Sequence, residues 1–420
     1  AAQPTVNHQR QLLRKTGLKA APLVGVVALA VFIAYPSIAA LVDEPRLLEL
    51  KWYFFAILLL ELTRVFVERI CHGTNMMKIS ASLSGWSAIS VLLITVPTVW
   101  FSPTAATVVA AKAAGMLIPS ARAIYSIYKA LTNTGDNNAV DPTSLPRVRE
   151  LATYGLTLAM ISLADFGFIQ TDIILLSYLT DSASAAVYSV GVLLVMKLTS
   201  ISRALGFGVS PQYAKADCPP EERLRLYQNA LKYVLVFCFP FAFFIGAFAS
   251  ETLNLLFGDK YADGGTTLAL MCLFLVMATV LAISSPVLDF GGKARIRAIA
   301  AFSGAAINIG LNLLWIPKYG AVGAALATLC GYFVLFLVTL IAVRLMLGNK
   351  LLDDRALRRL IVIVAPFLAL LVTACKFASS HGFWICMPAM ALLYPLAIVK
   401  LGIVEKAEVD RVMSFIKKKK

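Results

Sequence analysis

The chain has 420 residues, of which 59% are hydrophobic and 15% are charged, and its mean hydropathy is +0.80. A soluble domain cannot bury that much apolar surface, so the composition excludes the soluble globular class and predicts an all-α polytopic membrane protein. Seven cysteines and three histidines are scattered without CxxC or metal-ligand spacing, so we predict no metal site, no cofactor and no disulfide framework.

Twelve apolar segments are each long enough to cross a bilayer as a helix. In chain order they cover residues 20–42, 50–67, 79–101, 104–128, 150–179, 183–210, 230–257, 264–290, 294–316, 319–347, 357–377 and 381–404.

The distribution of basic residues explains the net charge of +15. If the spans alternate in direction, the side that holds the N-terminus carries 28 of the counted lysines and arginines. The other side carries five, which are Arg46, Lys51, Lys260, Lys318 and Lys376. Cytoplasmic loops are enriched in basic residues, so both termini are predicted to be cytoplasmic. The positive charge therefore reflects topology, and nucleic acid is not an expected partner.

An internal duplication links two parts of the chain. The turn and hairpin residues Gly292, Arg297, Gly304 and Pro317 have counterparts about 219 residues earlier, at Gly73, Lys78, Gly85 and Pro97. The spacing is identical for the first three and differs by one residue at the last. Small residues after the Pro317–Gly320 turn favour close helix packing in a bilayer. A duplicated membrane chain is typical of transporters whose site lies between the two halves.

The duplication divides the chain into five predicted parts: an N-terminal bundle (1–131), a cytoplasmic linker (132–149), a C-terminal bundle (150–348), an extra helix pair (349–404) and a basic amphipathic tail (405–420). The N-terminal bundle holds four spans, which match the last four of the six spans in the C-terminal bundle. We therefore expect a fourteen-helix protein whose first helix pair is missing here. A natural twelve-helix chain with an asymmetric repeat is the alternative.

Several motifs resemble the MOP (multidrug/oligosaccharidyl-lipid/polysaccharide) flippase superfamily, and most closely its polysaccharide biosynthesis or oligosaccharide flippase branch. The most specific are Leu-Phe-Gly-Asp-Lys-Tyr at 256–261, Gly-Gly-Lys at 291–293 and Ile-Pro-Lys-Tyr-Gly-Ala-Val-Gly-Ala-Ala at 316–325. The segments 171–178 and 186–190 also match the opening pair of the second half.

The resemblance implies two pseudo-symmetric helical bundles around a central cavity, followed by two C-terminal helices. It also implies a non-enzymatic flippase of the inner (plasma) membrane. Its substrate would be a polyprenyl-diphosphate-linked oligosaccharide, moved from the cytoplasmic to the outer leaflet for O-antigen, capsule or exopolysaccharide synthesis. The expected partners are this substrate and the bilayer. A polysaccharide polymerase or another assembly protein is a further candidate partner.

Charged residues inside the spans are costly, so they are the candidate site residues. Five basic residues are predicted to line a cationic cavity for the diphosphate, and three acidic residues are predicted to couple an ion or balance charge. The basic set is Lys197, Arg203, Arg64, Lys112 and Arg122, and the acidic set is Asp172, Asp165 and Glu61. The alternative is that these charges neutralise one another in pairs or reach the membrane interface.

Three other functions were weighed. A multidrug extruder of the same superfamily would favour an acidic cavity, whereas the residues inside the spans are basic by five to three. A membrane polymerase, ligase or glycosyltransferase would need a large outer loop or a soluble domain, and the predicted outer loops are short. A non-transporting scaffold would leave the charges inside the spans without a purpose.

Overall fold

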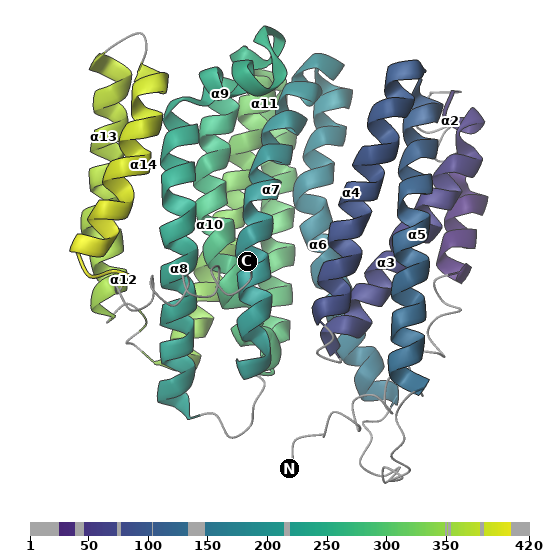
Figure 1. The fold of residues 1–420 in the computed structure, drawn as a ribbon, viewed down its shortest axis with the longest axis horizontal. Coiled ribbons are helices and arrows are strands. Elements are labelled where there is room, and N and C mark those ends of the chain that lie inside the picture. The colour runs from purple at the N-terminus through teal and green to yellow at the C-terminus, as the bar shows by residue number, and fades with distance from the viewer. Residues whose placement is uncertain are drawn as a thin grey trace, which may run out of the picture. The chain divides into compact units, whose positions relative to one another are not determined.

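The computed structural model describes residues 25–37, 46–73, 77–102, 104–132, 148–213, 219–348, 351, 354–378 and 382–404. The described part is helical and contains no strand, and the described residues of every predicted span lie mainly in helix (Figure 1). The predicted all-α polytopic architecture is confirmed. Seven of the described helices are long and apolar enough to cross a membrane, and the 54-residue helix α11 counts once among them although it covers two predicted spans. The tail 405–420 and most of the linker lie outside the described residues.

The chain divides into two compact units, Ala1–Arg147 and Val148–Lys420. The first unit contains a helix at residues 25–37, then α2 (Arg46–Glu49), α3 (Lys51–Gly73), α4 (Met77–Phe101) and α5 (Ala105–Thr132). Helix α5 packs against both α3 and α4. Helices α4 and α5 approach closely at Gly115, where a Cβ atom would lie 2.6 Å from the Cα atom of Val91. The small residue therefore fixes where these two helices cross.

The second unit begins with α6 (Val148–Leu179), α7 (Ser182–Tyr213), α8 (Pro220–Ala247) and α9 (Ala249–Phe257). A short 3₁₀ helix, η2 (Asp259–Gly264), leads into α10 (Gly265–Phe290), and α11 (Ala294–Leu347) follows. The last elements are α12 (Arg355–Arg359), the π-helical turn η3 (Leu360–Val364), α13 (Ala365–Ala378) and α14 (Gly382–Lys400).

Helix α11 is a hairpin of two arms. Gly320 interrupts it with φ 53° and ψ −131°, a conformation that only glycine adopts readily. The reversal is visible in the pairing of residues across the turn, since a Cβ on Gly304 would lie 2.5 Å from the carbonyl oxygen of Gly331. The predicted tight turn at Pro317–Gly320 therefore separates the two crossings.

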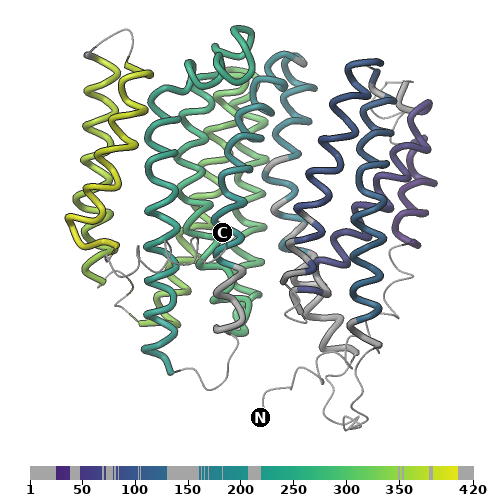
Figure 2. Tube along the Cα trace, viewed as in Figure 1, coloured from purple at the N-terminus to yellow at the C-terminus, as the bar shows by residue number. Residues whose placement is uncertain are grey.

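The C-terminal helix pair packs within the second unit. Helices α13 and α14 lie beside α8, as Figure 2 shows in yellow and teal. Leu357, Leu360 and Val364 are fully buried in the same apolar core as Leu231 and Val234 of α8. The pair thus shares a continuous core with the bundle that precedes it.

Candidate functional site

The most buried polar group in the second unit is centred on Asp172. This residue lies on α6, and its carboxylate is fully buried. It follows a stripe of buried residues at helical spacing, which includes Phe168 one turn earlier and Ala164 two turns earlier. Phe168 packs over Gly304 and Gly331, so α6 rests in the groove between the two arms of the α11 hairpin. That packing brings Asp172 to the polar residues of both arms.

Four neutral side chains surround Asp172. The Tyr188 hydroxyl on α7 donates to its Oδ2 atom at 2.5 Å, and the Asn312 amide donates to its Oδ1 atom at 2.5 Å. The Thr328 hydroxyl also donates to Oδ2. Asn308 completes the cluster by donating to the Thr328 oxygen at 3.2 Å. We call these five residues the Asp172 cluster.

The cluster lacks a positive charge. Within the part of the chain that the structure describes, no lysine, arginine or histidine nitrogen lies within 4.0 Å of the Asp172 carboxylate. The side-chain oxygens of Asn308 and Asn312 are also buried and have no hydrogen-bond partner among the described residues. An uncompensated buried carboxylate costs several kcal/mol of stability, about 3 or more in a membrane. The oxygen-rich cluster is therefore suited to hold a small hard cation or a proton.

In contrast to the Asp172 cluster, the first unit holds a network in which acidic and basic side chains pair with one another. Arg64 lies 2.8 Å from Glu61 and 2.6 Å from Glu68 along α3, and Lys112 of α5 reaches Glu61 at 3.7 Å. All four side chains are partly exposed. Two acidic and two basic groups thus balance one another. Three of these residues were candidates from the sequence, whereas Glu68 was missed, although its spacing of four residues from Arg64 is a recognisable signal.

Arg122 stands apart from this network. It lines a cavity of about 230 Å³ between α4 and α5, together with Ser82 and Trp86 of α4 and Pro119 and Ser126 of α5. The Arg122 side chain is exposed. Its guanidinium has no carboxylate oxygen within 4.0 Å among the described residues.

The other predicted basic residues lie on α7. Lys197 and Arg203 are both exposed, and the Arg203 guanidinium approaches the Thr199 hydroxyl at 3.5 Å. The side chain of Asp165 lies outside the described residues. Arg64, Lys112 and Arg122 belong to the first unit and Lys197 and Arg203 to the second, so the single cationic cavity remains a prediction.

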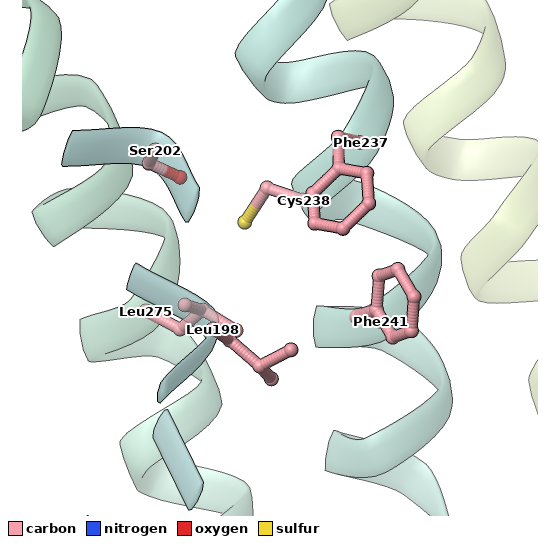
Figure 3. Close-up of a pocket in the computed structure, with 6 residues that line it drawn as sticks. All are labelled: Leu198, Ser202, Phe237, Cys238, Phe241 and Leu275. Atoms are coloured by element: carbon pink, nitrogen blue, oxygen red, sulfur yellow. The ribbon is translucent and has the colours of Figure 1, made fainter. Parts of the chain in front are cut away.

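A gap between α7, α8 and α10 in the second unit is too small for a ligand. Phe237, Cys238 and Phe241 of α8 face Leu198 and Ser202 of α7 and Leu275 of α10 (Figure 3). The gap between them has no room for a water-sized molecule. The Thr279 hydroxyl fills the adjacent space, where it donates to the Cys238 sulfur at 3.3 Å.

Comparison with known proteins agrees with this architecture. The model of a family described as "Polysaccharide biosynthesis protein" matches residues 4–209. The fold is shared with the Vibrio cholerae MATE transporter VcmN, at a TM-score of 0.63 and 14% identity, with 84% of each chain covered. It is also shared with the lipid II flippase MurJ in an inward closed conformation, at a TM-score of 0.61 and 14% identity, with 94% of this chain and 84% of that chain covered.

The predicted resemblance to polysaccharide biosynthesis proteins is confirmed by the family model over residues 4–209, and the fold is shared with a flippase and with a transporter named as a member of the MOP superfamily. A curated relative, an uncharacterized membrane protein of Methanocaldococcus jannaschii, is 26% identical over 281 residues, which are 65% of this chain. The chain spans about half the length of that relative, 54%. The proteins that share the fold are named as transporters or a flippase, which agrees with the prediction of a non-enzymatic membrane protein.

Proposed function

We propose that this protein is an ion-coupled flippase for polyprenyl-diphosphate-linked oligosaccharides. It would carry the sugar headgroup from the cytoplasmic to the outer leaflet by alternating access, with both termini in the cytoplasm. The observation that carries the proposal is the Asp172 cluster, because a buried carboxylate with only neutral partners needs a mobile positive charge. The family description favours a substrate of polysaccharide biosynthesis over other anionic lipids.

The coupling ion would bind among the oxygens of the Asp172 cluster. The side-chain oxygens of Asn308 and Asn312 are buried without a partner, and a proton on Asp172 would leave them so. A metal cation such as Na⁺ would be bound by these oxygens and the carboxylate together, with the Tyr188 and Thr328 hydroxyls turning their lone pairs inward. The donors that now stabilise the ionised carboxylate would thus become ligands when the ion arrives.

Ion binding would act on the conformation through the helices that supply the ligands. Asp172 comes from α6, Tyr188 from α7 and the three remaining residues from the α11 hairpin. A bound cation would favour the arrangement that keeps these helices together. A ligand shifts a conformational equilibrium only by its difference in affinity for the two states, so the cluster must be looser in the other state.

The substrate would contact the basic residues that have no acidic partner. The network of Arg64 and Lys112 is already balanced by Glu61 and Glu68. Arg122, Lys197 and Arg203 have no carboxylate partner among the described residues and are exposed. We expect these three to attract the diphosphate, with arginine binding phosphate oxygens in a bidentate manner and lysine acting as a point charge.

Extrusion of cationic drugs is the second candidate function, because MATE transporters share the fold. The acidic side of the Arg64 network could then attract a cation. The alignment with MurJ nevertheless covers more of this chain than those with the MATE transporters, 94% against 84% and 83%.

A transport assay separates the two functions. The complete chain would be placed in liposomes with an isoprenyl-diphosphate oligosaccharide whose sugar carries a fluorophore, and a membrane-impermeant quencher would be added outside. We expect the protected pool to become accessible only with intact protein, and faster when a Na⁺ gradient is imposed. If that pool stays protected while a cationic dye crosses, the protein is a drug extruder.

A further inference from the structure

The cavity between α4 and α5 has a defined shape. The two helices touch where Gly115 meets Val91, and toward the first turns of α4 and the last turns of α5 they still pack through Leu83, Ala123 and Ile127. Pro119 lies one turn beyond the crossing, where it removes a backbone hydrogen bond and favours a bend. The cavity lies beside this contact, with Arg122 and Trp86 in its lining and the apolar Leu83 and Ala123 among its walls.

The volume of the cavity suits a headgroup. About 230 Å³ is room for roughly eight water molecules, at about 30 Å³ each. This is below the range of about 300–1,000 Å³ that is typical of sites for drug-sized ligands. A whole oligosaccharide would not fit, whereas a phosphate group and one sugar ring match the scale.

The side chains that line the cavity complement such a headgroup. Arg122 supplies a guanidinium without a carboxylate partner in the described chain. Trp86 is half exposed and offers an indole ring for stacking on a sugar. The Ser126 hydroxyl donates to the Arg122 backbone oxygen at 2.8 Å, so its lone pairs remain available, and Ser82 adds a second hydroxyl.

The cavity also lies at a suitable depth. It is lined by the first turns of α4 and the last turns of α5, which the distribution of basic residues predicts to be cytoplasmic. Trp86 lies nine residues into α4, so the cavity extends from near the cytoplasmic end of this helix toward its middle.

We propose that the cavity formed by Ser82, Trp86, Arg122 and Ser126 is a loading subsite for the phosphate and first sugar of a lipid headgroup in the cytoplasmic leaflet. This inference rests on the proposed function and deepens it. Arg122 would bind the phosphate oxygens, and Trp86 would stack on the sugar. The lipid tail would stay in the bilayer beside the two helices. The headgroup would be captured here before it moves to the other exposed cations.

Binding measurements in nanodiscs test this subsite directly. The complete chain would be titrated with an isoprenyl diphosphate carrying a fluorescent disaccharide, first in phosphatidylcholine and then with phosphatidylglycerol added. Loss of a hydrogen bond to a charged group predicts that Arg122→Gln raises the Kd about tenfold. We expect Trp86→Ala to raise it several-fold, about threefold or more, and Arg122→Lys to recover part of the loss. The matched controls Lys129→Gln on α5 and Trp100→Ala at the far end of α4 should change the Kd less than about twofold.

Transport kinetics provide a second readout. A loading subsite predicts that Arg122→Gln raises the half-saturating substrate concentration while the maximal rate stays within about twofold. A Kd and a half-saturating concentration that both equal those of Lys129→Gln would overturn the proposal. Equal occupancy of the wild-type subsite by phosphatidylglycerol and by the sugar lipid would also overturn the proposal, because the subsite would then recognise bulk phospholipid. If wild type binds the sugar lipid through Arg122 but moves none of it, the subsite stands and the proposed function fails.

Discussion

In the first unit, Arg64 is flanked by Glu61 and Glu68 at 2.8 and 2.6 Å, whereas in the second unit Asp172 has only neutral partners. The first group is partly exposed and the second is fully buried. Exposed charges that already have partners contribute little to stability and are easily exchanged. A buried charge without a counter-charge destabilises the protein, and a bound ion of opposite charge removes that cost.

The two groups of charges therefore suit different roles in the two units. The charge network of the first unit is balanced by its own acidic and basic groups, so it needs no added ion. The Asp172 cluster of the second unit is rigidly packed by the α11 hairpin, so its oxygens are preorganised for a small ion. The two units thus differ in the chemistry of their charges.

The largest effect is expected for Asp172→Asn. This substitution keeps the size of the side chain and removes its charge, so ion coupling should be lost and gradient-driven transport should fall at least about a hundredfold. Thermal stability of the wild type should rise with Na⁺ concentration, since the ion binds only the folded state. The variant should show no such rise. Transport by Asp172→Asn that still responds to the ion gradient would contradict the role of the carboxylate.

The packing that positions the cluster can be tested at Gly331. A Cβ there would lie 2.5 Å from the Gly304 carbonyl oxygen and 2.8 Å from the Phe168 ring, so Gly331→Ala must push the hairpin arms apart. Overpacking of this kind costs about 2 kcal/mol of stability. Thermal unfolding in detergent would measure the loss. Gly310→Ala is the matched control in the first arm, because a Cβ there meets nothing within 4 Å, and it should be neutral or stabilising. Equal unfolding temperatures for the two variants would contradict close packing at Gly331.

A smaller effect is expected for Tyr188→Phe. It removes the hydroxyl that donates to Asp172 at 2.5 Å and lies 3.1 Å from the Thr328 hydroxyl, while the buried ring remains. A metal cation would lose one oxygen ligand, so the half-saturating ion concentration for transport should rise about tenfold. Ser189→Ala, on the same helix, is the control, because its hydroxyl only bonds the Ala185 backbone oxygen. An unchanged ion dependence in Tyr188→Phe would exclude the hydroxyl from the ion site.

Sequence patterns predicted the helices better than the contacts between them. The twelve spans and the turn before Gly320 follow from hydropathy and from glycine and proline positions, and Asp172 follows from the cost of a charge in an apolar run. The partners of Asp172 were missed because they come from helices about 16 and 140–156 residues away in sequence. Asn308 and Asn312 share one helical face, four residues apart, and that spacing was the available signal.

The smallest effect is expected for Glu61→Gln. The direction in which it changes the half-saturating substrate concentration distinguishes the two candidate functions. Arg64 keeps Glu68 as a partner, and Lys112 loses a contact of 3.7 Å, so the free energy of unfolding should change by less than about 1 kcal/mol. If the basic side of the network receives a diphosphate, removal of a competing carboxylate should lower the half-saturating concentration of the sugar lipid about twofold. A drug extruder predicts the reverse, because a cationic substrate would lose an attractive charge. Initial rates measured against the concentration of each substrate type decide between the two functions. Weaker sugar-lipid affinity in Glu61→Gln would argue against phosphate binding at Arg64 and Lys112.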